Sequence, residues 1–289
     1  MTTLGLVFVP SLPPEKLRGV ALLAEAQGLD ELWLWEDCFQ ESGIASAAAV
    51  LAWTTHLNVG IGLLPVPLRN VALTAMEAAT IDRLFPGRLR LGVGHGVQDW
   101  MGQVGVRAES PMTLLREYVL ALRRLLAGER VTTDGRYVRL DGVALDWPPA
   151  APVPVHVGAV GPRTLQLSGE VGDATILTMG VSPDELRAAL VEVERGRAAG
   201  GRTGPHPVTI SVLAATGPDA ETRLLRDYAR WEVDPSKDLG VAGDAAAVAA
   251  AVRRWADAGA TTVVIQPTMD EPDIEGFLRF VTTEVRPLL

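Results

Sequence analysis

Residues 59–70 read Val-Gly-Ile-Gly-Leu-Leu-Pro-Val-Pro-Leu-Arg-Asn, and they predict the end of a buried strand followed by a rigid apolar connection. Gly62 lets another group approach the backbone closely, because glycine has no β-carbon. Pro65 and Pro67 hold the following residues extended and remove two N–H donors. At the carboxyl end of a strand, such a segment forms a flat apolar wall. This wall suits either a bound ligand or a buried crossover of a large α/β domain.

The same alternation of apolar strand and amphipathic helix recurs along the chain and predicts the α/β class with a parallel sheet. Strands are expected at residues 4–9, 31–35, 57–62, 88–93, 153–157, 174–177, 208–214 and 261–266. Helices are expected at residues 13–27, 43–54, 70–85, 110–126, 162–170, from 182 onward, 219–230, 244–258 and 272–285. Eight such units in 289 residues predict a closed (β/α)8 TIM barrel, a single domain over 1–289. An open doubly wound sheet is the alternative.

One insertion interrupts the alternation, between the fourth expected helix and the fifth core strand. Residues 131–133 and 137–140 predict a short hairpin that closes through a turn at Asp134 and Gly135. This hairpin and residues 98–110 are the segments expected to define the substrate pocket.

Composition excludes several classes of function. The net charge is −9 with no basic cluster, which argues against a nucleic-acid partner. A single cysteine, Cys38, supports no disulfide framework, and four scattered histidines predict no metal site. We find no charged-then-apolar signal pattern and no apolar run of the ~18 residues that a membrane span needs. We therefore expect a cytoplasmic enzyme acting on a small molecule, with no membrane partner.

Candidate catalytic residues follow the carboxyl ends of the expected strands, where (β/α)8 barrels bind ligands. Glu36 and Asp37 are adjacent carboxylates beside Trp35, a setting that favours a raised pKa and proton transfer. If the face that carries Glu36 is the barrel interior, this acid looks into the ligand cavity. Pairing with Arg69 is the alternative for Glu36, and capping of the next turn is the alternative for Asp37. His95 follows the fourth strand and suits either catalysis or simple packing.

The other strand ends offer glycine and apolar surface with few acids or bases. Alternate glycines after the fourth strand leave N–H groups free to face an anion, although no P-loop lysine follows. After the fifth strand, Pro162 begins a helix whose free N–H groups, together with Arg163, suit a phosphate. This pattern favours a large planar cofactor over a hydrolase that uses paired carboxylates. The candidate cofactor-binding residues are Gly62, Leu63, Leu64, Gly94, His95, Gly96, Val97, Gly158, Ala159, Gly161, Pro162, Arg163 and Met179.

Four stretches in combination resemble the bacterial luciferase-like oxidoreductases, over nearly the whole chain and in the same order. They are residues 28–37 (Gly-Leu-Asp-Glu-Leu-Trp-Leu-Trp-Glu-Asp), 62–70, 78–96 (which ends Arg-Leu-Arg-Leu-Gly-Val-Gly-His-Gly) and 154–174 (which begins Pro-Val-His-Val-Gly-Ala-Val-Gly-Pro-Arg). The arrangement is most similar to the branch that uses the deazaflavin coenzyme F420.

This resemblance implies hydride transfer between F420 and an organic substrate. The alternatives are an FMN-dependent monooxygenase that uses oxygen and a relative that only binds a flavin-like ligand. It also implies a non-prolyl cis peptide at Gly62–Leu63 behind the cofactor ring, and a homodimer, because family members usually pair. The family's Asp-His pair falls on Glu36 and Asp37, so its histidine is replaced here.

Overall fold

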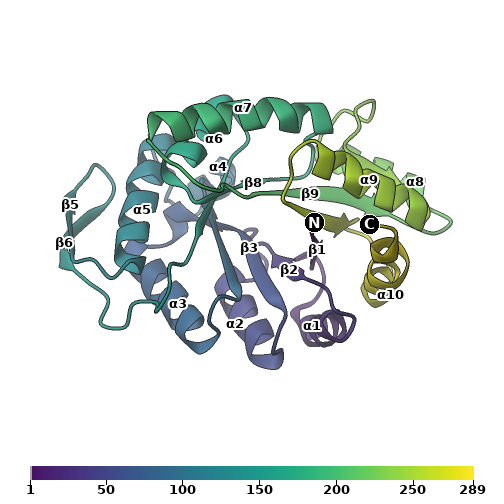
Figure 1. The fold of residues 1–289 in the computed structure, drawn as a ribbon, viewed down its shortest axis with the longest axis horizontal. Coiled ribbons are helices and arrows are strands. Elements are labelled where there is room, and N and C mark those ends of the chain that lie inside the picture. Colours follow the sequence, from purple (N-terminus) through teal and green to yellow (C-terminus); the bar gives the residue numbers. More distant parts are fainter. Residues whose placement is uncertain (1) are drawn as a thin grey trace.

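The computed structural model describes residues 2–289, whose strands close into a parallel barrel with helices around the outside (Figure 1). Neighbouring strands in the sheet follow the chain order, and the ring closes because β11 pairs with β1 and β8 pairs with β9. The barrel strands are β1 (Thr3–Val7), β2 (Glu31–Leu34), β3 (Asn58–Pro65), β4 (Leu89–Gly94), β7 (Val155–Gly158), β8 (Ala174–Leu177), β9 (Val208–Ala215) and β11 (Thr262–Pro267). The predicted (β/α)8 TIM barrel is confirmed.

Helices cover the outer face of the barrel through apolar stripes of the kind that helical periodicity produces. They are α1 (Leu17–Ala26), α2 (Gly43–Trp53), α3 (Val71–Leu84), α5 (Pro111–Leu126), α6 (Pro162–Val171), α7 (Pro183–Ala199), α8 (Ala220–Arg230), α9 (Ala245–Asp257) and α10 (Ile274–Arg279). The start of α7 is fixed by a capping box in which Ser182 and Glu185 each accept a backbone N–H of the other. Over residues 2–289, no helix combines the length and apolarity that crossing a membrane requires.

Several short elements differ from the expected pattern. The sequence analysis did not predict the helix α4 (Gln98–Gln103) or the strand β10 (Gly240–Ala242). Strand β10 pairs with the carboxyl-terminal residues of β9. The last helix is split, because α10 continues as a π-helical turn over Phe280–Val285. Short 3-10 turns occupy Pro14–Lys16, Val66–Leu68 and Arg286–Leu288.

The inserted hairpin is present and projects away from the barrel (Figure 1). Its strands are β5 (Val131–Asp134) and β6 (Arg139–Val143). The predicted two-residue turn is wrong, because Asp134 pairs with Arg139 within the ladder and the turn spans residues 135–138. Glu117 on α5 explains the longer turn. Its carboxylate accepts the N–H groups of Tyr137 at 2.8 Å and Val138 at 3.0 Å.

Trp33 fills the middle of the barrel, and glycines on the adjacent strands make room for it. A β-carbon at Gly60 would lie 2.3 Å from the indole ring, and one at Gly5 would lie 3.0 Å from it. The indole Nε1 donates to Glu31 at 2.9 Å, so the buried polar atom is satisfied. Because successive side chains of a strand alternate between faces, Trp33 in the interior sends Leu34 and Glu36 toward the helix layer.

The barrel has a hollow at each end. The hollow at the amino ends of the strands is larger, about 820 Å³, but its charged side chains are already paired. Arg90 binds Glu31 at 3.1 Å, and Arg123 binds Asp173 at 3.0 Å. The hollow at the carboxyl ends is about 480 Å³. We take the smaller one as the candidate site, because ligand-binding loops of this fold follow the carboxyl ends.

Candidate functional site

The cavity at the carboxyl ends is walled mainly by apolar side chains and glycine. Its lining residues are Trp35, Glu36, Asp37, Gly62, Leu63, Pro65, His95, Gly96, Val97, Trp100, Gly158, Ala159, Val160, Gly161, Thr164, Ile176, Thr178, Met179, Ser211, Trp231 and Val233. Most of the residues predicted from the strand ends are therefore brought together in one place. A mostly apolar cavity with a few converging polar groups is the usual form of a small-molecule site.

Four of the predicted site residues lie off this wall. Leu64 is 1% exposed and packs in the core between the barrel and the helices. Gly94 lies beneath the side chain of Leu63. Pro162 and Arg163 are exposed in the first turn of α6, outside the cavity. Of the four, Leu64 is the one that the structure removes from ligand contact, because it is buried away from the cavity.

Leu63 determines the shape of the cavity floor. The Gly62–Leu63 peptide bond is cis, as the resemblance implies, and the Cys38–Phe39 bond is also cis. The Cδ2 atom of Leu63 lies 2.5 Å from the position that a β-carbon at Gly94 would take, so glycine there accommodates Leu63. A β-carbon at Gly161, by contrast, would meet nothing within 4 Å. Of the glycines on β4 and after β7, Gly161 is the one that faces open space.

Glu36 braces three elements. Its carboxylate accepts two bonds from the Arg69 guanidinium, of which Nη2–Oε2 is 2.9 Å, and a third from the Gly43 N–H at 2.9 Å. Arg69 also approaches Glu77 at 3.4 Å. The side chain points to the helix layer and both oxygens are occupied. The geometry therefore favours the pairing with Arg69 over proton transfer.

Of the two carboxyl groups on the cavity wall, Asp37 is the one that forms no ion pair within residues 2–289. Burial raises its pKa to about 6. The Gln40 N–H donates to the backbone carbonyl of Asp37, and within residues 2–289 the Asp37 side chain accepts no hydrogen bond from this turn. A carboxyl that titrates near neutral pH on a cavity wall can donate or accept a proton during a reaction.

His95 contributes a neutral ring to the same wall. Burial lowers its pKa, and the nearby carbonyl of Pro111 only partly opposes this effect. Its Nδ1 is buried and has no hydrogen-bond partner within residues 2–289. An unsatisfied buried nitrogen is costly, and a bound ligand would satisfy it.

Trp231 and Val233 complete the wall and were not predicted, whereas Trp100 falls within residues 98–110, a segment expected to define the substrate pocket. Trp100 lies on α4, whereas Trp231 and Val233 lie just beyond α8. The turn after α8 is a Schellman motif, because the Val233 N–H donates to the Tyr228 carbonyl at 3.0 Å and the Glu232 N–H to the Ala229 carbonyl at 3.4 Å. Glu232, at φ 53°, occupies the left-handed position that is usually glycine. Because glycine is missing there, the turn could not be predicted from the sequence.

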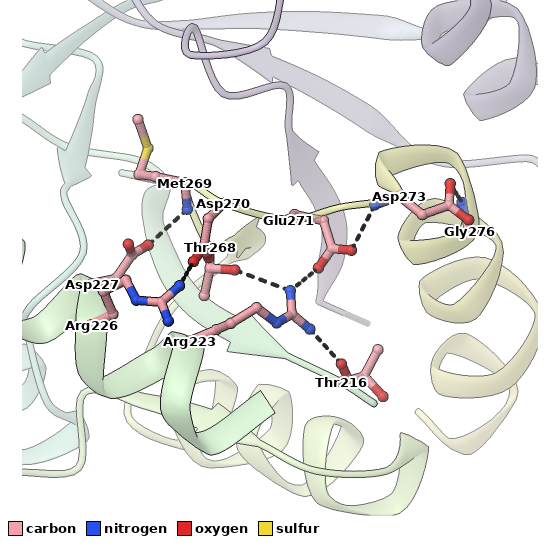
Figure 2. A network of polar contacts seen from close by, with 10 residues as sticks. All are labelled: Thr216, Arg223, Arg226, Asp227, Thr268, Met269, Asp270, Glu271, Asp273 and Gly276. Atoms are coloured by element: carbon pink, nitrogen blue, oxygen red, sulfur yellow. Dashed lines mark hydrogen bonds and ion pairs between the residues drawn. The ribbon is translucent and has the colours of Figure 1, made fainter. Parts of the chain in front are cut away.

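Figure 2 shows how α8 is anchored to the loop after β11. The Arg223 guanidinium donates to Thr268 Oγ1 at 3.2 Å, and Asp227 Oδ2 accepts the Met269 N–H at 2.8 Å. The side chains of Asp227 and Thr268 are fully buried, which makes these bonds hard to replace with water. Because α8 leads directly into Trp231, the network fixes the helix that carries this part of the wall.

The fold and the site together define a (β/α)8 barrel with a mainly apolar cavity at the carboxyl ends of its strands, beside a carboxyl whose pKa is raised. Residues 7–258 match the model of the luciferase-like monooxygenases, and the chain belongs to that family. It is 33% identical to a 5,10-methylenetetrahydromethanopterin reductase of Methanolobus tindarius over 79% of this chain and 69% of the relative. It is 32% identical to an F420-dependent glucose-6-phosphate dehydrogenase of Kineococcus radiotolerans over 96% of this chain and 93% of the relative.

A solved structure has the same fold along the whole chain. It is an F420-dependent secondary alcohol dehydrogenase in complex with an F420-acetone adduct, with a TM-score of 0.89 and 20% identity. The alignment covers 100% of this chain and 99% of that one. At this identity the likeness establishes the shared fold.

Proposed function

We propose that this protein is an F420-dependent oxidoreductase that moves a hydride between the deazaflavin and a small organic substrate. The observation that carries the proposal is the similarity, over 96% of the chain, to a relative named as F420-dependent. The apolar cavity at the carboxyl ends supports it, because a planar tricyclic ring needs extended apolar contact. FMN is the alternative cofactor.

The residues of the cavity fit such a group. Leu63 and Val97 would contact the ring, and the unpartnered Nδ1 of His95 could satisfy a polar atom of the ring or the substrate. The open space at Gly161 leads to the amino terminus of α6, where N–H groups and Arg163 would hold a phosphate of the tail. When bound, F420 supplies a centre that accepts or donates a hydride.

The protein's own residues supply the proton and exclude water from the reacting groups. In the reducing direction, Asp37 gives its proton to the substrate oxygen, and in the oxidising direction it takes that proton back. The brace of Glu36 and Arg69 holds the strand end that carries Asp37. Trp100 and Trp231 exclude water from the reacting groups.

Cofactor titration tests the proposal. F420 and FMN would be added separately to the purified protein, and binding followed by cofactor fluorescence. We expect F420 to bind at least about tenfold more tightly, a difference of about 1.4 kcal/mol. Bleaching of F420 absorbance by an alcohol under anaerobic conditions would establish hydride transfer. Tight FMN binding with oxygen consumption would instead identify an FMN-dependent monooxygenase.

We further propose that the enzyme is a homodimer. Leu73, Met76 and Leu84 share one face of α3 and are 46%, 57% and 66% exposed, which leaves an apolar strip on the surface. Exposed apolar strips of this kind are typical of protein interfaces. Light scattering should give the mass of a dimer, and Met76→Glu should give that of a monomer. A monomeric mass for the unchanged protein would contradict this proposal.

A further inference from the structure

Within residues 2–289, no positively charged side chain lines the cavity. The ionisable side chains on its described wall are Glu36, Asp37 and His95, with neither lysine nor arginine among the lining residues within 2–289. Burial lowers the pKa of His95, so its ring is neutral near pH 7. A phosphate or carboxylate entering this space would lose its water shell and meet the Asp37 carboxyl instead of a cation. That transfer is unfavourable.

The arginines of the neighbouring loops either pair with other groups or lie outside the cavity. Arg69 is bound to Glu36. Arg107, which follows α4, binds Asp99 at 2.9 Å and the Gln98 carbonyl at 2.9 Å. Arg163 is exposed on the outer turn of α6 and can serve a cofactor tail outside the cavity. These three guanidinium groups therefore leave the cavity interior without a counter-charge for an anion.

Three indoles from different elements surround the same space. Trp35 follows β2, Trp100 lies on α4, and Trp231 follows α8. Trp231 is 36% exposed, so a ligand that covers it would remove apolar surface from water. Flat aromatic walls favour ring-containing ligands, because rings stack on indole with little loss of conformational freedom.

Few polar groups remain to orient such a ligand. Besides Asp37 and His95, the wall carries the hydroxyl groups of Thr164, Thr178 and Ser211. A site with one titratable carboxyl among short hydroxyls matches a substrate with a single oxygen function.

We propose that the substrate is an uncharged, mainly apolar ring compound that carries a ketone or the corresponding secondary alcohol. This inference rests on the proposed function. In reduction, the carbon–oxygen π bond breaks as the carbonyl carbon receives a hydride from reduced F420. The oxygen receives the Asp37 proton, giving the alcohol and oxidised F420. Oxidation of the alcohol reverses each of these transfers.

A pair of ketones that differ only in charge tests the proposal. Acetophenone and 4-acetylbenzoate share the ring and the carbonyl, and the second adds a carboxylate. Calorimetry on the F420-loaded protein should show acetophenone binding at least about tenfold more tightly. Reduction by reduced F420 should follow the same order, and glucose 6-phosphate should not be oxidised.

Substitutions at Trp231 test whether the aromatic wall and the missing positive charge cause the preference for the uncharged ketone. Trp231→Leu should weaken acetophenone binding about fivefold, because the stacking surface is lost. Trp231→Arg should bring 4-acetylbenzoate binding to within about twofold of acetophenone, because the new guanidinium can pair with the carboxylate. Trp147→Leu is the matched control, since Trp147 is 72% exposed and lies outside the cavity. It should change neither affinity. Circular dichroism would verify that each variant is folded.

Two results would overturn the inference while leaving the proposed function intact. One is equal binding of the two ketones, or binding of neither, by a protein that still binds F420. The other is oxidation of glucose 6-phosphate by the loaded enzyme. A protein that does not bind F420 would contradict the proposed function itself, and the separate cofactor titration distinguishes that case.

Discussion

The Cδ2 atom of Leu63 lies 2.1 Å from the position that a β-carbon at Gly158 would take. The two residues come from neighbouring parts of the barrel mouth, at β3 and at the end of β7, and both line the cavity. A β-carbon at position 158 would therefore force the Leu63 side chain to move, whether or not a ligand is bound. At the floor of the cavity, the Leu63 side chain therefore fills the space beside Gly158.

Gly158→Ala should destabilise the protein by about 1–3 kcal/mol, the usual cost of overpacking a tight contact. The displaced Leu63 side chain would also move into the cavity and weaken cofactor binding. Urea unfolding measures the first effect, and F420 titration measures the second. Leu63→Ala combined with Gly158→Ala should recover most of the loss, because the double variant removes the colliding atoms.

Gly161→Ala is the matched control for Gly158→Ala. Its β-carbon would enter free space, and its φ of −82° suits any residue. We expect a change in stability below about 0.5 kcal/mol. If Gly158→Ala were equally harmless, the contact with Leu63 would not be the reason for glycine at that position.

Glu36→Gln should lower stability by about 1–3 kcal/mol while the enzyme keeps most of its turnover. The substitution removes the charge that pairs with the partly buried Arg69 guanidinium and leaves that cation poorly compensated. Thermal unfolding and steady-state rates measure the two quantities. Glu77→Gln is the control, because it leaves the pair of Glu36 and Arg69 intact. Loss of turnover with full stability would restore Glu36 as a proton-transfer group.

The sequence predicted the barrel because its signals are local and repeated. Each strand is a short apolar run, each helix has an apolar stripe, and caps such as Ser182 with Glu185 mark the helix starts. The position of the cavity followed from the fold class alone, since ligands bind at the carboxyl ends of the strands. Asp37 and His95 could be selected because they come directly after strands.

What the sequence could not decide depends on contacts between strands. Alternation places Trp33 and Glu36 on opposite faces but does not say which face is the interior. Room for an indole opens only when glycines of other strands, such as Gly60, are brought beside it. Likewise, Gly158 looked like a space for a ligand until Leu63 was placed over it.

Glu232→Gly should stabilise the protein by about 0.5–1 kcal/mol. Glu232 adopts a left-handed conformation, at φ 53°, that glycine adopts without steric cost. The rise in the free energy of unfolding would be measured by urea denaturation. Glu232→Ala keeps the β-carbon and should give no comparable gain. A loss of stability in the glycine variant would mean that the Glu232 side chain itself holds the turn.

Arg163→Ala should weaken F420 binding by about 1–3 kcal/mol, the value of a charge-assisted contact to a phosphate. The side chain is exposed in the first turn of α6 beside the open space at Gly161, so its removal should not disturb the fold. Fluorescence titration of the variant and the unchanged protein measures the difference at low and high salt. Equal affinities would show that Arg163 is a solvated surface residue.

Asp37→Asn should abolish a pH dependence centred near pH 6. Burial holds the Asp37 proton to about pH 6, so ketone reduction should fall as the pH rises through that value and alcohol oxidation should fall as the pH drops below it. Asparagine neither donates nor accepts this proton, so the variant should lose most of its turnover at every pH while still binding F420. Rates measured between pH 5 and 8 in both directions would show opposite profiles for the unchanged protein.

The raised pKa of Asp37 also makes the free energy of unfolding depend on pH, and this dependence can be measured without any turnover. This pKa is about 6 in the folded protein against an ordinary value of 3.8, so the folded state binds the proton more tightly. This stabilisation is fully present below about pH 3.8 and is lost as the pH rises through about 6. Asp37→Asn is neutral throughout, so its stability relative to the unchanged protein should increase by about 2–3 kcal/mol between pH 4 and 7 and then stay constant. Parallel curves for the two proteins would mean that Asp37 titrates as an exposed carboxyl, and the assigned proton would have to come from another group.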